Sequence, residues 1–234
     1  MMSEKICLVT GVGPGTGRAI AVRFAKGGYK VAMLARDKDR LNEIEASTDN
    51  TLGLVCDVSN PEQLSATVAQ VQDQLGPISC LIHNAVGGAL GNFLEIEAEV
   101  LEQNFQINTM ALYHLGRLLA PSMIEAGEGV ILATGNTSAY RGKDRFAAFA
   151  PSKAAQRILL ESMARTLGPK GVHCGYVAID AVIDVPWTRQ AFADRPDEFF
   201  SQPSDIAHEV FHMAHQPRST WSFDTVIRPF GENW

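Results

Sequence analysis

A glycine-rich turn near the N-terminus is the first segment whose residue types and spacing indicate chemistry. Residues 10–17 read TGVGPGTG, between a short apolar run and a segment with helical spacing that begins near Arg18. Glycines let a pyrophosphate approach the backbone closely, and a helix N-terminus offers it unpaired N–H groups and a positive dipole end. Glycines also occur in turns for local conformational reasons. The interpretation as a nucleotide-binding turn therefore depends on its position between a strand and a helix. We expect a dinucleotide to contact Gly11, Gly13, Gly15, Thr16, Gly17 and Arg18.

Two charged residues bear on the identity of this dinucleotide. The apolar run of residues 29–35 is followed by Arg36 and Asp37. An acidic residue at such a strand end accepts hydrogen bonds from the ribose hydroxyls of NAD, whereas a guanidinium can bind the 2′-phosphate of NADP through two nitrogens. Arg36 therefore favours NADP(H) over NAD(H). The alternative is that Arg36 is a solvated loop charge and that Asp37, itself a candidate helix N-cap, binds the ribose.

The elements that position these residues follow a regular succession. Short runs rich in β-branched residues are continuously apolar, as in strands buried on both faces. Segments with apolar residues three or four apart, ended by Gly or Pro, separate them and indicate amphipathic helices. The succession predicts an α/β Rossmann fold, a doubly wound seven-stranded parallel sheet with helices on both faces. The predicted strands are residues 6–10, 29–35, 52–56, 80–83, 130–134, 173–179 and 225–227.

Composition narrows the class of protein. The 234 residues, 46% of them hydrophobic, suffice for one substantial core, and no linker interrupts them, so we expect a single domain over residues 1–234 with its cofactor-binding part at about 1–150. The net charge of -6 and the absence of a long basic run argue against a nucleic-acid partner. No signal-like or membrane-spanning segment is present, so we expect a cytoplasmic protein. We expect no metal, since the four widely spaced cysteines form no C-x-x-C pair.

Taken in order, these and further motifs resemble the short-chain dehydrogenase/reductase family. Its glycine motif T-G-x-x-x-G-x-G matches residues 10–17, and the resemblance extends over about residues 5–227. It implies an oxidoreductase that uses a nicotinamide dinucleotide. Further matches are Asp57-Val58 to the adenine-contacting D-V, Asn84-Ala85 to N-N-A-G, Asn108 to the helix-four asparagine, and Ser152-Lys153-Ala154-Ala155 to S-K-A-A.

The resemblance fails at the family's proton-handling residues. The family places a tyrosine four residues before the lysine and a serine thirteen residues before that tyrosine, and this chain has Phe149 and Asn136 there. Loss of a positioned general acid lowers a rate by roughly 10²- to 10⁴-fold. The resemblance still implies that Lys153 binds the nicotinamide ribose, and that Asn108 holds a helix kink and a water beside Lys153.

Several groups are candidates to replace the missing proton donor. Ser138 lies two residues from the expected serine, Tyr140 follows closely, and Lys153 can donate a proton if its site lowers its pKa. His83 stands at the first asparagine of the family's N-N-A-G. For Ser138 and Tyr140 the alternative is an ordinary polar loop, and for His83 it is a strand-end histidine bonded to backbone.

The region after the sixth predicted strand resembles the family's substrate loop by position, at about residues 180–204. Its aromatic residues either line an apolar substrate pocket or belong to the core or an interface. The family's Pro-Gly turn is absent there, and the resemblance in position implies that the backbone near Ile183 contacts the nicotinamide carboxamide. The resemblance also implies a homodimer or homotetramer through helices four and five, at about residues 100–123 and 148–167.

Three functions are compatible with these residues. The leading one is an NADP(H)-dependent oxidoreductase that acts on a small carbonyl or alcohol substrate with an atypical active site. The alternative is a nicotinamide-dinucleotide-binding protein without redox turnover, a sensor or interaction module, as Phe149 and Asn136 suggest. A third, lyase or isomerase chemistry with Lys153 or His83 as acid–base group, has no specific motif. Fold alone does not decide among them.

Overall fold

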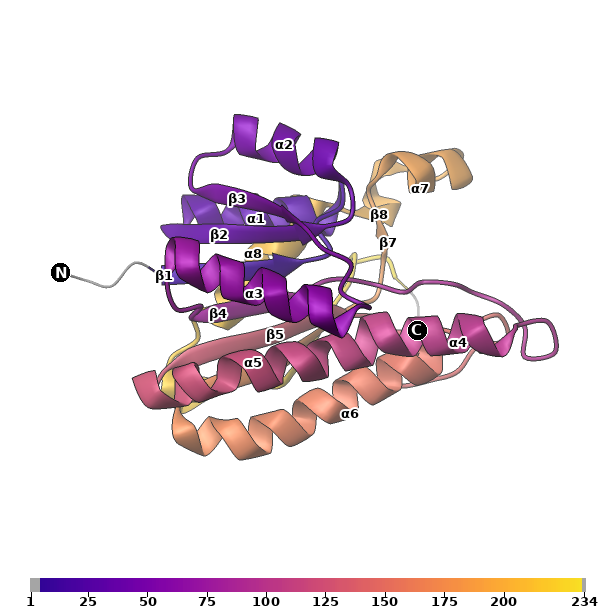
Figure 1. Ribbon diagram of the computed structural model, residues 1–234. Coiled ribbons are helices and arrows are strands. Elements are labelled where there is room, and N and C mark those ends of the chain that lie inside the picture. The colour runs from indigo at the N-terminus through magenta and orange to yellow at the C-terminus, as the bar shows by residue number, and fades with distance from the viewer. Residues whose placement is uncertain (1–4, 233–234) are drawn as a thin grey trace.

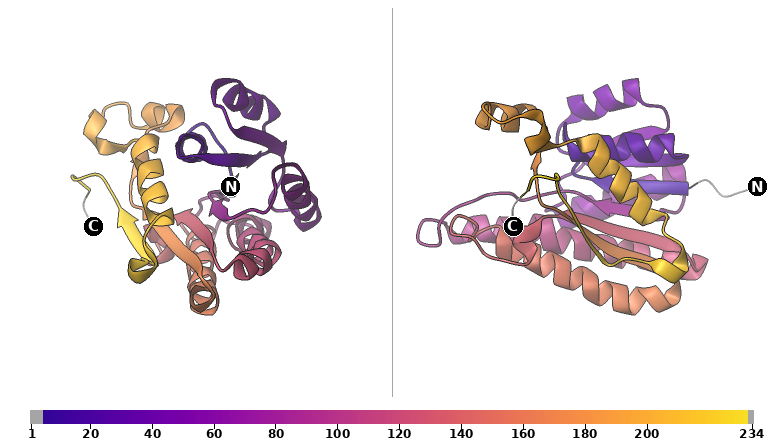
Figure 2. Two further views of the ribbon diagram at one scale, coloured as in Figure 1. Left: turned by 90° about the vertical axis from the view of Figure 1, so that its left-hand side faces the viewer. Right: turned by 180° about the vertical axis from the view of Figure 1, so that it is seen from behind.

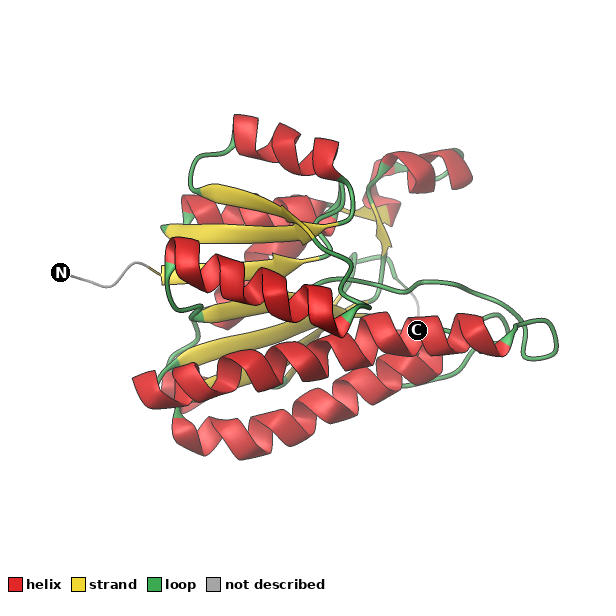
Figure 3. Cartoon of the chain, in the orientation of Figure 1, coloured by secondary structure: helices red, strands yellow, loops and turns green. Residues whose placement is uncertain are grey.

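The protein is built on one parallel sheet. In the computed structural model, which describes residues 5–232, seven strands lie in the order β3-β2-β1-β4-β5-β6-β9, and all neighbouring pairs are parallel (Figures 1 and 3). This confirms the predicted doubly wound sheet, and each strand end lies within one residue of its prediction. The strands are β1 (Lys5–Thr10), β2 (Tyr29–Ala35), β3 (Thr51–Val55), β4 (Cys80–His83), β5 (Gly129–Gly135), β6 (Val172–Ile179) and β9 (Asp224–Ile227).

Helices cover both faces of the sheet (Figure 2). One buried apolar cluster joins the sheet to α3, α5 and α6, and a second joins its other face to α1, α2 and α8. In α3, Leu64, Val68 and Val71 repeat at helical spacing and are buried, as an amphipathic helix against a sheet requires. The helices are α1 (Thr16–Lys26), α2 (Lys38–Ser47), α3 (Pro61–Leu75), α4 (Ala98–Phe105), α5 (Ala111–Ala126), α6 (Ala150–Leu167) and α8 (Pro203–Ala214).

The central strands are apolar without alternation because helices lie on both sides of them. All eight residues of β6 are buried, and so are all four of β4. Among the described residues, no helix has the length and apolarity needed to cross a membrane.

Two regions differ from the sequence prediction. The single helix expected over residues 100–123 is interrupted by a π-helical turn, η1 (Gln106–Met110), between α4 and α5. The expected loop at residues 180–204 instead contains β7 (Val182–Ile183), α7 (Pro186–Ala191), the 3-10 turn η4 (Asp197–Phe199) and β8 (Phe200–Ser201), and β7 pairs in parallel with β8. The remaining 3-10 turns are η2 (Thr137–Ala139), η3 (Gly168–Lys170) and η5 (Arg218–Thr220).

The strand order reverses beside β1, which lies between β2 and β4. The chain leaves β1 toward the β2 side of the sheet and reaches the β4 side only later. The loops after β1 and β4 therefore part, and a crevice opens at their carboxyl ends, where doubly wound sheets bind ligands. The glycine turn follows β1 directly, so the fold places it at this crevice.

The glycine turn supplies a test of the packing. A Cβ atom on Gly17 would lie 2.3 Å from the Gly11 carbonyl oxygen, whereas a Cβ on Gly13 would meet no heavy atom of a described residue within 4 Å beyond its two chain neighbours. We expect Gly17→Ala to lower the free energy of unfolding by about 1–3 kcal/mol, a loss larger than the roughly 1 kcal/mol that alanine gains in helix propensity. The matched variant Gly13→Ala should change it by less than about 0.5 kcal/mol. Urea unfolding measures both, and equal losses would contradict the packing described.

Candidate active site

A cleft of about 910 Å³ opens at the carboxyl ends of the central strands. The glycine turn, the ends of β2, β4 and β5, the start of α6 and the segment from β6 to α7 line it. The cleft lining thus comes from most of the chain and extends well beyond residue 150, the expected end of the cofactor-binding part. Of the residues predicted to bind a dinucleotide, those that line the cleft are Gly11, Gly13, Gly15, Thr16, Gly17, Arg36, Asp57, Val58, Asn84, Ala85, Lys153 and Ile183.

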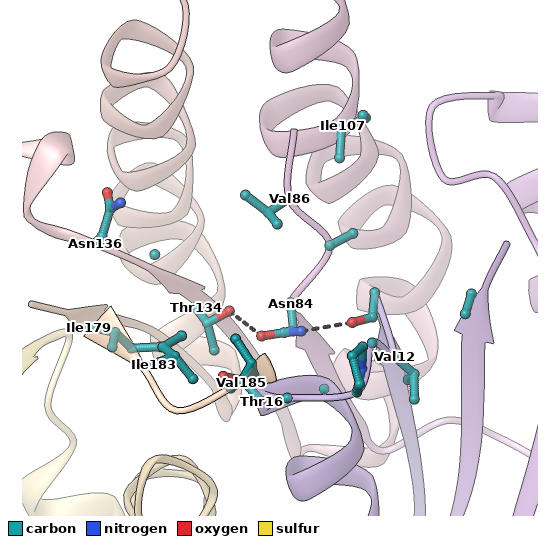
Figure 4. A pocket seen from close by; sticks show the side chains of 18 of the residues that line it. Val12, Thr16, Asn84, Val86, Ile107, Thr134, Asn136, Ile179, Ile183 and Val185 are labelled. Carbon is teal, nitrogen blue, oxygen red and sulfur yellow. Dashed lines mark hydrogen bonds between the residues drawn. The ribbon is translucent and has the colours of Figure 1, made fainter. Parts of the chain in front are cut away.

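Asn84 fixes the glycine turn against the centre of the sheet. Its Nδ2 donates to the Gly11 carbonyl at 2.9 Å, and its Oδ1 accepts from Thr134 Oγ1 at 2.8 Å (Figure 4). Gly11 has a φ of +70°, and a Cβ there would lie 2.4 Å from Ala85 Cα, so only glycine fits. Three strands, β1, β4 and β5, therefore share one hydrogen-bonded clamp at the floor of the cleft.

The turn and the helix after it fit a phosphate group. Thr16 is the first residue of α1, and its Oγ1 is buried and has no hydrogen-bond partner among the described residues. A buried hydroxyl without a partner is costly, and an anion at the helix N-terminus would accept its hydrogen bond. The open space beside Gly13 leaves room for that anion.

Two arginines lie at the end of the cleft near α2. Arg36 and Arg40 both line it. Asp37 also lines it, but its Oδ1 accepts from the Arg40 backbone N–H at 3.1 Å and its Oδ2 pairs with the Arg40 guanidinium at 3.0 Å. Asp37 is thus the N-cap of α2, and its carboxylate is occupied within the protein. The structure does not bring Arg18 to the cleft lining, because its guanidinium pairs with Glu43 at 3.0 Å.

Asp57 and Val58 line the cleft beyond β3. The Asp57 Oδ1 accepts hydrogen bonds from the backbone and side chain of Ser59, at 3.0 and 2.7 Å. These bonds fix the loop after β3, which lies next to Arg36 because β3 pairs with β2.

Lys153 lies at the opposite end, buried with only 2% of its surface exposed. Its Nζ donates to the Thr134 carbonyl at 3.3 Å and to Gln156 Oε1 at 3.0 Å. No ion pair joins it to a carboxylate within the described part of the chain. Burial lowers the pKa of Lys153 to about 7, so this amine exchanges its proton near neutral pH.

The π-helical turn η1 holds Asn108 beside Lys153. Asn108 is fully buried and exchanges two hydrogen bonds with the Gly87 backbone, both at 2.9 Å. Its carbonyl accepts from Gln156 Nε2 at 2.7 Å. The connection between Asn108 and Lys153 therefore runs through the Gln156 side chain.

The two positions where the resemblance predicts hydroxyls also line the cleft. Phe149 is buried there, with its ring centroid 6.0 Å from Lys153 Nζ. Asn136 lines the cleft as well, and its Oδ1 accepts hydrogen bonds from the Ser138 backbone and hydroxyl. Phe149 has no proton to give, and Asn136 contributes an amide.

The other candidate donors lie outside the cleft lining. His83 Nε2 lies 3.1 Å from the Ile107 carbonyl, so it carries the proton, and Nδ1 accepts from Thr10 Oγ1 at 2.9 Å. Burial, with the Lys153 ammonium second, lowers the pKa of His83 to about 3. Tyr140 donates to Asp224, and burial and this carboxylate raise its pKa. Of the four candidate donors, the structure brings only Lys153 to the cleft.

The segment after β6 closes one side of the cleft with apolar side chains. Trp187 and Phe192 line the cleft, as do Ile183 and Val185. Phe199 and Phe200 instead pack against each other with ring centroids 5.2 Å apart. Trp187 and Phe192 therefore lie at the cleft and Phe199 and Phe200 do not line it, while a role of these aromatics in substrate binding stays a prediction.

The sequence prediction missed Arg40, which lines the cleft, and Gln156, which bonds Lys153 from outside the cleft lining, although signals for both exist. Arg40 is four residues after Arg36, and Gln156 is three after Lys153, so the spacing of each pair brings them together on a helix or at its start.

The burial of Lys153 predicts a pH dependence of stability. Its pKa is about 7 in the folded state against an ordinary value of 10.5, so between these pH values the unfolded chain binds more protons. The free energy of unfolding should therefore rise with pH across this window, by at most about 1.4 kcal/mol per pH unit from this group. Lys153→Met should remove that rise, whereas Lys170→Met, at an exposed position, should keep it. Urea unfolding at pH 7, 8 and 9 measures it, and parallel curves for both variants would contradict the assignment.

Comparisons with known proteins bear on this site. Residues 5–195 match the family model for short chain dehydrogenases. The 7alpha-hydroxysteroid dehydrogenase of Escherichia coli (strain K12) is 29% identical over 242 residues, which cover 98% of this chain and 94% of the relative.

Solved structures agree in fold. A metagenomic short-chain oxidoreductase in complex with NADP has a TM-score of 0.83 and 26% identity, and covers 99% of both chains. An NADPH-bound short chain oxidoreductase from Pseudomonas aeruginosa PAO1, described as containing an atypical catalytic center, has a TM-score of 0.88 and 23% identity, covering 99% of this chain and 98% of that one. Because the family model spans most of its length, this chain belongs to the short-chain dehydrogenase family.

Proposed function

We propose that this protein is an NADP(H)-dependent oxidoreductase that interconverts a small carbonyl compound and its alcohol. The observation that carries the proposal is the arrangement along one cleft of two arginines, a glycine turn at a helix N-terminus and a buried lysine. The curated and structural relatives named above, a dehydrogenase and two oxidoreductases that bind NADP or NADPH, support it.

The arginine end of the cleft supports NADP(H) as the cofactor. Arg36 and Arg40 both line the cleft, and the Arg40 guanidinium pairs with Asp37. We therefore assign the Arg36 guanidinium to the 2′-phosphate, because guanidiniums bind phosphate oxygens through paired hydrogen bonds. Asp37, the residue that would favour the ribose hydroxyls of NAD, is engaged by Arg40 through both oxygens. The Thr16 hydroxyl and the space beside Gly13 fit the pyrophosphate.

Lys153 is the proton donor in this proposal. A nicotinamide bound in the cleft supplies or accepts a hydride. The carbonyl oxygen then needs a proton, and Lys153 combines a place in the cleft lining with a pKa of about 7. Phe149 supplies an apolar wall next to the amine and contributes no proton.

The substrate in this proposal is an apolar carbonyl compound. Phe149, Trp187 and Phe192 give the cleft large apolar surfaces, and Trp187 is 58% exposed. Asn136 is the amide available to orient a substrate oxygen.

A homo-oligomer through α5 and α6 remains a prediction. Tyr113 and Leu118 on α5 and Ile158 on α6 are large apolar side chains at the surface, and such side chains suit an interface.

The cofactor preference is tested by replacing an arginine. Removal of a charge-assisted contact typically costs about 1.5–3 kcal/mol, so Arg36→Ala should weaken NADPH binding roughly 10- to 100-fold and leave NADH binding nearly unchanged. Titration of cofactor fluorescence gives both dissociation constants. Arg165→Ala, at an arginine on the exposed side of α6, is the matched control. Wild-type protein that binds NADH more tightly than NADPH would refute the assignment.

Turnover and the missing tyrosine are tested together. With NADPH and a panel of apolar ketones and aldehydes, we expect wild-type protein to oxidise NADPH at a low rate, followed by absorbance. Phe149→Tyr adds a hydroxyl beside Lys153 and should raise the rate by about 10²- to 10⁴-fold. Phe146→Tyr, outside this cleft, is the control. NADPH binding without oxidation by any carbonyl would support the alternative, a dinucleotide-binding protein without turnover.

A further inference from the structure

Gln156 is a buried amide whose position neither the resemblance nor the cleft lining explains. It lies three residues after Lys153 on α6 and is 0% exposed. Its Oε1 accepts from Lys153 Nζ at 3.0 Å, and its Nε2 donates to the Asn108 carbonyl at 2.7 Å. One side chain therefore joins the buried amine to the π-helical turn.

The orientation of this amide is fixed by its partners. A backbone carbonyl can only accept a hydrogen bond, so the nitrogen of Gln156 must face Asn108 and its oxygen must face Lys153. Asn108 is itself held by its two bonds to Gly87 and by a bond from its Nδ2 to Ser152 Oγ at 2.8 Å. The acceptor offered to Lys153 thus belongs to a network of buried, hydrogen-bonded side chains.

This network determines which proton Lys153 can release. A protonated amine has three N–H donors, and two of them go to Thr134 and Gln156. Lys153 also lines the cleft, so its third N–H is the one available there. When the amine loses its proton, the lone pair takes that third place.

We propose that Gln156, anchored by the Asn108 carbonyl, is a positioning residue. It holds one N–H group of Lys153 while the Thr134 carbonyl holds another, and so directs the third into the cleft as the proton given to the substrate. This inference rests on the proposed function. In the reduction, the carbonyl carbon takes the hydride from the reduced nicotinamide and the carbonyl oxygen takes the Lys153 proton. The products are an alcohol, the oxidised nicotinamide and a neutral amine, which regains its proton from water.

The other titratable groups around Lys153 do not supply this proton. His83, at the end of β4, is neutral with both nitrogens bonded. Tyr176 on β6 is kept neutral by burial, which raises its pKa. Asp180, just after β6, accepts a hydrogen bond from Thr137 Oγ1 at 2.6 Å. No titratable residue lies on η1 or β5.

Two variants of Gln156 alter the acceptor beside Lys153 and should shift the pKa of Lys153 in opposite directions. Gln156→Glu places a carboxylate beside the amine and should raise the pKa of Lys153 by about one unit or more. Gln156→Met keeps the length of the side chain but removes the acceptor, so the pKa should fall and kcat at pH 7 should drop roughly 10- to 100-fold, with a smaller change in KM. Gln74→Glu, on the exposed side of α3, is the control for added charge.

The pKa is read without turnover, by NMR of lysine labelled with ¹³C at Cε in protein free of cofactor, with Lys153→Met identifying the signal. Opposite shifts in the two variants, matched by shifts in the pH above which kcat falls, are the expected result. An unchanged Lys153 pKa in both variants, in protein that still unfolds cooperatively, would overturn the role of Gln156 and leave the proposed function standing. Absence of turnover by wild-type protein would overturn the proposed function, and the catalytic role of Gln156 with it, even if the pKa values shift.

Discussion

The Lys153 amine is buried with no carboxylate partner in the described part of the chain, and this burial constrains several elements at once. A charged group away from water is costly unless polar groups surround it. Here they come from β5, through the Thr134 carbonyl, and from Gln156, which in turn relies on η1 for its own partner. The interruption of the long helix by a π-helical turn and the lowered pKa of Lys153 thus belong to one arrangement.

The sheet makes the cleft possible because its strands are parallel and end at the same edge. Gly11, Asn84 and Thr134 are far apart in sequence, yet they form one clamp after β1, β4 and β5. The clamp fixes the glycine turn, and the turn fixes the N-terminus of α1, where a phosphate binds most favourably. Stability of the central strands and shape of the site therefore depend on the same hydrogen bonds.

Much of the fold could be predicted from the sequence, because buried parallel strands and amphipathic helices leave clear apolar patterns. The glycine turn and Arg36 could be placed at the cleft because the loops after parallel strands share one edge. The partners of individual polar side chains could not be predicted. Arg18 pairs with Glu43 on another helix, and His83 is closed off by Thr10 and the Ile107 carbonyl. Such choices depend on neighbours brought together only by the tertiary structure.

The role of Lys153 as proton donor is tested most directly by measuring NADPH oxidation in a single turnover. Protein saturated with NADPH is mixed with an excess of an apolar ketone, and NADPH absorbance is followed from pH 6 to pH 9 for wild-type protein and Lys153→Met. The expected result is a wild-type rate that falls above about pH 7, as the ammonium is lost, and a Lys153→Met rate reduced roughly 10²-fold or more with NADPH still bound. A Lys153→Met rate equal to that of wild-type protein, or a wild-type rate independent of pH over this range, would contradict the role of Lys153 as proton donor.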